Sequence, residues 1–130
     1  MGLVADGDSY TPALSSDGRF VVFASLASNL VTGDSNATRD IFVHDRAIGA
    51  TQRVSVDPTG GDGDLESMLP AISADGRYVA FVSYATNLMP GDTNENADIF
   101  LHDLQVGTTE RVSVDSTGAQ RDGGSLFPTV

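Results

Sequence analysis

The sequence contains no lysine and no cysteine among its 130 residues. Without lysine, Schiff-base chemistry and a lysine-dependent phosphate-binding loop are excluded. Without cysteine, disulfides, a thiolate nucleophile and thiolate metal ligands are excluded, and the redox compartment stays undetermined. No apolar run approaches the roughly 18 residues that span a bilayer, and the first residues lack the basic start and apolar centre of a signal peptide. We therefore expect no membrane partner, and a chain that either stays where it is made or is a piece of a longer one.

Positive charge is also scarce. The seven basic residues are all arginine and are opposed by 18 acidic residues, which gives a formal net charge of -11. A strongly acidic chain is repelled by phosphate backbones. We therefore expect no nucleic-acid partner.

The sequence does contain an internal repeat of 58 residues. Laid over one another without insertions, residues 9–66 and 67–124 share 31 identities, a little over half of the positions. Residues 125–130 begin a third copy and correspond to residues 9–14. The chain therefore divides into a lead of residues 1–8, two whole units and a duplicated first strand.

Each unit reads as four short strands separated by turns. In the first unit we expect strands at residues 9–14, 19–25, 40–45 and 51–56. An Asp-Gly pair between apolar runs is a strong hairpin signal, and the apolar run after it suits a strand that is covered on both faces. Pro12 suits a position that donates no hydrogen bond to a neighbouring strand, and no stretch has the spacing and caps of a helix.

Four antiparallel strands per repeat predict an all-β fold. The specific expectation is a β-propeller with two four-stranded blades in each chain, at residues 9–66 and 67–124. The alternative is a single eight-stranded β-sandwich, although a sandwich does not need so regular a repeat.

Two segments of each unit carry a family resemblance. They run from Pro12 to Phe23 and from Asp40 to Asp45, and they recur from Pro70 to Phe81 and from Asp98 to Asp103. At these residues the sequence resembles the TolB-type propeller repeat of bacterial proteins, and the resemblance covers nearly the whole chain. It implies the propeller fold but no single function, because such blades occur in many contexts. Members commonly have six or more blades and are largely exported, so the resemblance also implies an exported bacterial parent. Because only two blades are present here, it further implies a fragment, a metagenomic piece or an engineered chain.

Two blades leave two apolar faces uncovered, which predicts self-association. Repeats of this kind need several neighbours before burial offsets the entropy of ordering, and closed propellers have about 4–8 blades. Head-to-tail packing of copies into a ring covers both of these apolar faces. The resemblance favours six blades from three chains, with eight blades from four chains next. We further expect residues 125–130 either to cap the first blade of a neighbouring copy or to be displaced by that copy's own first strand.

The long polar loop of each unit is the candidate metal site, and calcium is the cofactor it suggests. In the second unit, oxygen-bearing side chains alternate at Asp92, Asn94, Asn96 and Asp98, which is similar to the opening of a calcium loop. The glycine and the bidentate glutamate that complete such a loop are missing. The alternative is that these side chains form local turns with their own backbone. The first unit has a weaker set, next to an arginine: Asp34, Asn36 and Asp40.

Two histidines, His44 and His102, each precede an aspartate. Adjacent residues on a strand point to opposite faces, so neither histidine can pair with its neighbour as a general base does. We expect packed histidines or polar contacts between blades. We also expect Arg19 and Arg77 to pair with carboxylates of the same or the next blade.

Three functions stay open on this reading. The first is a non-catalytic scaffold that assembles with itself into a symmetric ring. The second is a module that binds a protein, a glycan or a small ligand through its channel mouth and calcium-stabilised loops. The third is a hydrolase, but the sequence has no nucleophile elbow, dinucleotide loop or zinc motif. Because both copies share their loops, we favour the scaffold and expect no catalytic residues and no enzyme.

Overall fold

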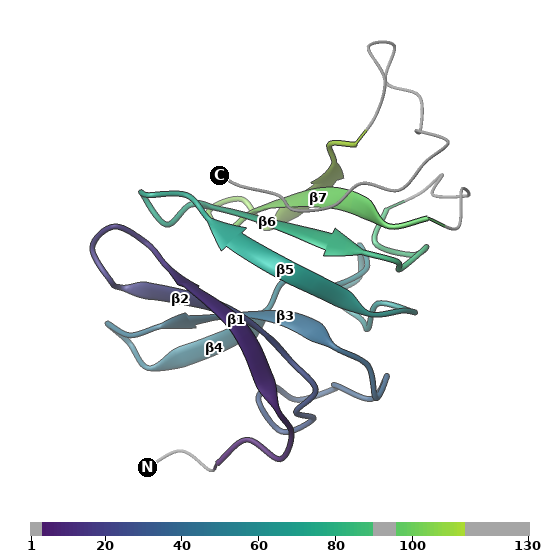
Figure 1. Ribbon diagram of the computed structural model, residues 1–130, viewed down its shortest axis with the longest axis horizontal. Helices are drawn as coiled ribbons and strands as arrows, with labels where there is room; N and C mark the ends of the chain where they lie inside the picture. The colour runs from purple at the N-terminus through teal and green to yellow at the C-terminus, as the bar shows by residue number, and fades with distance from the viewer. Residues whose placement is uncertain (1–3, 90–95, 114–130) are drawn as a thin grey trace.

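The computed structural model describes residues 4–89 and 96–113, and within them the chain forms eight strands and no helix (Figure 1). The strands form two antiparallel sheets with the orders β1-β2-β3-β4 and β5-β6-β7-β8. None of the described residues belongs to a helix that could cross a membrane. The strand bounds are β1 Ser9–Leu14, β2 Phe20–Ser25, β3 Asp40–Asp45, β4 Ala50–Arg53, β5 Ser67–Ile72, β6 Tyr78–Ser83, β7 Asp98–Asp103 and β8 Thr108–Arg111.

The hairpin between β1 and β2 forms where the Asp-Gly pair predicted it. Gly18 has a φ of 70°, in the left-handed region that glycine adopts without steric cost. The Asp17 carboxylate accepts hydrogen bonds from the Ser15 hydroxyl at 2.6 Å and from the Arg19 backbone N–H at 3.0 Å. These contacts lower the pKa of Asp17, the Ser15 hydroxyl most of all. The same arrangement recurs in the second sheet, so the hairpin is determined locally.

A bulge interrupts the pairing of β1 with β2. The register shifts between Tyr10 and Ala13, and Thr11 has a φ of 49°, which is uncommon for a residue other than glycine. The shift leaves Pro12, which has no N–H, out of the hydrogen-bonded ladder. The prediction that this proline donates nothing to the ladder is confirmed, and the equivalent irregularity recurs before Pro70.

The fourth strand is shorter than predicted. It ends at Arg53 rather than at residue 56, although the Val54 backbone N–H still donates to the Ile41 carbonyl at 2.8 Å. At the next position the Ser55 hydroxyl, not the backbone, accepts from the Ile41 N–H at 3.0 Å and donates to Asp40 at 2.7 Å. The Ser55 side chain therefore replaces the backbone hydrogen bonds of the strand, although the alternation of polar and apolar residues predicted that the strand would continue.

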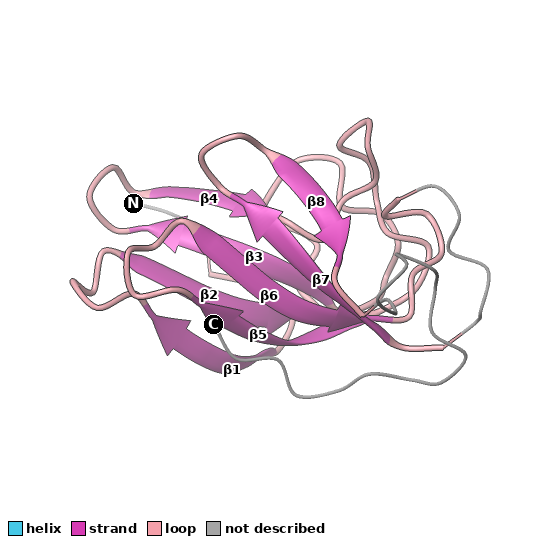
Figure 2. Cartoon of the chain, turned by 90° about the horizontal axis from the view of Figure 1, so that it is seen from above, coloured by secondary structure: helices cyan, strands magenta, loops and turns pink. Residues whose placement is uncertain are grey.

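The two sheets pack face to face, and the main core lies between them. In Figure 1 the sheet β1–β4 lies below the sheet β5–β8, and Figure 2 shows the two layers from above. β6 is buried along nearly its whole length, as its apolar run predicted, whereas β2 contains both buried and half-buried residues. β5 packs across β1, β2 and β3 of the first sheet. The second unit is thus seated on the first through one broad apolar face.

Candidate functional site

The interface between the two sheets shows how one unit receives the next. We call the side of each sheet that faces the following unit its leading face, and the side that faces the preceding unit its trailing face. Inside this chain, the leading face of the first sheet packs on the trailing face of the second. The buried apolar side chains that meet there are Val22, Ile41, Val43 and Val54 from the first sheet, and Ile72, Val79, Phe81 and Leu88 from the second.

Polar contacts fix the position of this interface at both ends of the strands. At the hairpin end, the backbone N–H and the hydroxyl of Ser16 donate to the Ala74 carbonyl at 2.9 and 2.8 Å. At the other end, the Ser67 N–H donates to the Arg39 carbonyl at 2.7 Å, and the Arg39 guanidinium lies 3.5 Å from the Glu66 carboxylate. The apolar surface is therefore docked in one register.

Among the described residues, the trailing face of the first sheet has no such neighbour. Leu14 is 60% exposed, whereas its equivalent Ile72 is 8% exposed. Phe23 is half-buried, whereas its equivalent Phe81 is fully buried. A shallow hollow of about 350 Å³ opens on this face beside Phe23 and Leu30. The face is an apolar surface of the type that the second sheet buries.

The leading face of the second sheet is incompletely covered in the same way. Val112 is 44% exposed, whereas its equivalent Val54 is fully buried. Leu101 is half-buried, whereas its equivalent Val43 is buried. The described residues therefore leave one face of each kind incompletely covered.

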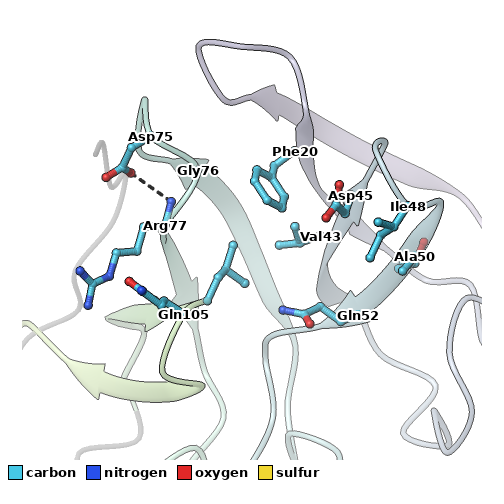
Figure 3. Close-up of a pocket in the computed structure, with 12 residues that line it drawn as sticks. Phe20, Val43, Asp45, Ile48, Ala50, Gln52, Asp75, Gly76, Arg77 and Gln105 are labelled. Carbon is cyan, nitrogen blue, oxygen red and sulfur yellow. Dashed lines mark hydrogen bonds between the residues drawn. The ribbon is translucent and has the colours of Figure 1, made fainter.

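A groove of about 520 Å³ lies at the hairpin end between the two sheets (Figure 3). Figure 3 shows Phe20, Ile48 and Gln52 on the wall of the first sheet, and Arg77 and Gln105 on the wall of the second. A second hollow, of about 410 Å³, lies on the leading face of the second sheet. It repeats the first wall 58 residues later and is lined by Tyr78, Leu101, Asp103, Thr108, Thr109 and Glu110. Within the described part of the chain it has no second wall and forms half of a groove.

The predicted metal ligands of the first unit are brought together, but around an arginine. The Arg53 guanidinium contacts Asp62 directly and lies 3.5 Å from Asp34 and 3.7 Å from Asp40. The side chains of Arg53, Asp34 and Asp40 are all at least 95% buried. Asn36 donates to Asp40 at 2.9 Å, and its own amide oxygen accepts from the Thr38 N–H at 3.1 Å. The local turn that was the alternative to a metal is thus present, and a guanidinium supplies the positive charge.

Burial dominates the electrostatics of this cluster. It raises the pKa of Asp40 to about 6, against the opposing effect of hydrogen bonds from Ser55 and Asn36 and of the Arg53 charge. It also raises the pKa of Asp34. Carboxylates this deeply buried need the arginine among them to stay charged at neutral pH.

Of the predicted ligands of the second unit, Asp92 and Asn94 lie outside the described residues. Asp98 is fully buried and accepts from the Ser113 hydroxyl at 2.7 Å, as Asp40 does from Ser55. Asn96 is half-buried beside it. Calcium binding in this loop stays a prediction, and no group of three or more acidic or histidine side chains arranged for a metal occurs among the described residues.

Both histidines contact a threonine of the adjacent strand. His44 Nδ1 lies 2.8 Å from the Thr51 hydroxyl, and His102 Nδ1 lies 2.7 Å from the Thr109 hydroxyl. Burial lowers the pKa of His102. Of the two expectations, packed histidines are confirmed, whereas both polar contacts lie within one sheet and not between the two sheets.

The two Asp-Gly-Arg arginines pair within their own sheets. Arg19 makes a bidentate ion pair with Asp45, at 2.8 and 2.7 Å. Arg77 pairs with Asp103 at 2.8 Å in the same way. Each guanidinium also covers the following aromatic ring, at 4.8 Å for Phe20 and 4.9 Å for Tyr78. These pairs join the β1–β2 and β5–β6 hairpins to the end of the third strand of each sheet.

Sequence reasoning missed Arg53 and Asp62 as members of the carboxylate cluster. Arg53 ends β4, and Asp62 lies in the segment that leads to the second sheet. A signal was present for the arginine, because Arg53 is repeated as Arg111 at the same position of the second unit. A repeated arginine on a strand that follows an acidic loop is a candidate for burial among those carboxylates.

Comparison with known proteins identifies a fold. No family model matches the chain, and no curated protein matches it. Solved structures do match, among them TolB from Acinetobacter baumannii, with a TM-score of 0.51 and 21% identity over 85% of this chain. The β-propeller domain of the Trilobed protease from Pyrococcus furiosus matches with a TM-score of 0.54 and 17% identity, also over 85%. The two sheets are therefore propeller blades, as the repeat predicted, and the chain spans only 22% and 28% of those two proteins.

Proposed function

Proceeding from two propeller blades with one uncovered face of each kind, we propose that this chain is a non-catalytic module that assembles head to tail with copies of itself into a closed ring. The trailing face of the first blade in one copy docks on the leading face of the second blade in the next. Every interface in the ring then repeats the one already present inside the chain. Three chains making six blades is the favoured ring, and four chains making eight blades is the next.

The observation that supports this proposal is the matched pair of exposed faces. Leu14 and Phe23 have the positions that Ile72 and Phe81 have in the buried interface. Val112 has the position of the buried Val54. Because all these positions are related by the 58-residue repeat, a second copy offers a surface of the right shape and polarity. Two different surfaces that are complementary to one another form a head-to-tail interface, which produces a ring where the rotation closes.

A structural role for the repeated polar residues supports the non-catalytic part of the proposal. The arginine–aspartate pairs, the histidine–threonine contacts and the serine–aspartate contacts each occur in both blades. A catalytic group is usually needed once in a site, whereas contacts that build a blade are needed in each.

The experiment is a mass measurement on the variant Leu14→Arg. We expect the wild-type chain to sediment at three times its 13.5 kDa mass and the variant to sediment as a monomer, because the arginine places a charge on a face that must be desolvated. The matched control is Ile48→Arg, since Ile48 is 72% exposed on the turn beside the groove inside the chain. A wild-type chain that stays monomeric at all concentrations would overturn the proposal.

A further inference from the structure

The groove inside the chain and the groove that a second copy would complete differ in charge at two facing positions. Inside the chain, Gln52 of the first blade and Leu104 of the second line opposite walls of one groove. Their equivalents on the uncovered faces, related by 58 residues, are Glu110 on the second blade and Arg46 on the first. An amide opposite a leucine is thus replaced by a carboxylate opposite a guanidinium.

We propose that Glu110 of one copy forms an ion pair with Arg46 of the next across the completed groove, and that this pair selects a second copy of the chain as the partner. This inference rests on the proposed assembly and identifies the two residues that would make the assembly specific. It predicts that copies recognise one another by a charge pair that the interface inside the chain does not contain.

The described contacts place both side chains at this surface. Glu110 is exposed on β8 and lines the half-groove of the second blade. Arg46 is exposed and donates from Nη1 to the Gly18 carbonyl at 2.9 Å, which holds its guanidinium against the first hairpin. The equivalent hairpin of the second blade is the one that packs on the first blade, where a Cβ on Gly76 would lie 2.5 Å from the Phe20 ring. Arg46 is therefore fixed next to the contact that a neighbouring copy would make.

The ion pair at the other end of the interface supports a division of roles. Inside the chain, Arg39 lies 3.5 Å from Glu66. The equivalent positions between copies are Ala97 and Asp8, which cannot form a pair. The interface inside the chain therefore has its pair at the loop end, whereas the interface between copies has its pair at the hairpin end. Complementary charges of this kind determine partner and register more than they determine raw affinity.

Reversing the charge of either residue distinguishes the proposed ion pair from a general effect of net charge on association. Each copy carries -11, so salt screens general repulsion as well as the pair, and variants are more informative than a salt titration. Glu110→Arg brings the net charge from -11 to about -9, which by itself would favour association. We expect the opposite, a weakening of association by about fivefold or more in sedimentation equilibrium, because two arginines then face one another.

The reciprocal and double variants complete the test. Arg46→Glu should weaken association similarly, and the double variant Glu110→Arg/Arg46→Glu, which keeps the wild-type net charge, should return to within about twofold of the wild type. The control is Gln52→Arg, the same new residue at the equivalent position inside the chain, which should leave association unchanged. Thermal unfolding of each variant at a concentration where it is monomeric shows that it folds.

The outcomes separate the inference from the proposed function. Association by the wild type, with either reversal harmless or with the double variant no better than the singles, overturns the pair but leaves the ring proposal intact. A wild-type chain that never associates overturns the ring proposal itself. Weakening by each reversal and recovery in the double variant supports both.

Discussion

Arg53 and Arg19 both pair with aspartates, but the two guanidinium groups differ in their exposure to water. The Arg53 side chain is 5% exposed and lies among three carboxylates, whereas the Arg19 side chain is 46% exposed. A buried charge depends on its partners for the solvation it has lost, while an exposed pair exchanges protein contacts for water at small net gain. The same residue type therefore has different structural importance at the two positions.

Replacing Arg53 by methionine should destabilise the chain far more than the same change at Arg19. Arg53→Met leaves the buried Asp34 and Asp40 without their cation, and removing one partner of a buried ion pair costs about 3–5 kcal/mol. Arg19→Met removes an exposed pair and should cost about 1 kcal/mol or less. Urea unfolding of both variants measures the difference in the free energy of unfolding. Equal losses would show that the Arg53 cluster is no more than a solvated surface pair.

The sequence predicted that three polar side chains lie together, because their spacing places them in one loop: Asp34, Asn36 and Asp40. It did not predict that the cation among them is the Arg53 guanidinium. Short polar side chains on a turn lie near one another whatever surrounds the turn. Arg53 reaches the cluster only because β4 pairs with β3 and ends beside that loop. That proximity depends on strand order and on the side from which each chain segment approaches, which local sequence does not determine.

At the scale of the element, the hairpins of the two blades have the same conformation but different surroundings. Gly18 and Gly76 have φ values of 70° and 76°. A Cβ at Gly76 would lie 2.5 Å from the Phe20 ring, whereas at Gly18 the nearest atom, on the flexible Arg46 side chain, would be 3.6 Å away. The Gly76 turn packs against the first blade, whereas among the described residues no atom of the second blade lies within 4 Å of a Cβ at Gly18.

Alanine at these two glycines separates backbone strain from packing between blades. Both variants force alanine into a left-handed conformation, which costs about 1–2 kcal/mol. Gly76→Ala also forces Phe20 to move, and overpacking of this kind adds about 1–3 kcal/mol. We therefore expect Gly76→Ala to lower the free energy of unfolding more than Gly18→Ala, in urea unfolding of the monomeric chain. If both cost the same, the ring of Phe20 yields freely and the blades are loosely docked.

Most of the elements could be predicted because their signals are local. The Asp-Gly hairpins, the apolar central strands and the four-strand repeat all follow from turn chemistry and hydrophobic pattern. The end of β4 could not be predicted in this way, because the strand pairing stops where the Ser55 side chain contacts Asp40. That choice depends on a residue 15 positions away, and alternation of polar and apolar residues does not detect such a contact.

At the scale of the whole molecule, the number of blades in the proposed ring would be set by the angle between successive blades. In that proposal the interface between copies resembles the one inside the chain, and a small difference in angle would change six blades to eight. Local sequence does not encode this angle, because it results from the packing of many side chains over one face. Ring size is thus the property of the proposed assembly that the sequence predicts least.

Fusing copies of the chain covalently allows ring size to be measured, because a fusion that contains all the blades of one ring should not associate further. Three copies joined end to end carry six blades, and four carry eight. If the ring closes at six, the threefold fusion buries both of its outer faces within one molecule, so we expect a monomer whose melting temperature does not depend on protein concentration. The fourfold fusion would then keep two blades outside the closed ring and associate through them. The reverse pattern, a monomeric fourfold fusion and a threefold fusion that associates, would show that eight blades close the ring, because three copies would leave it two blades short.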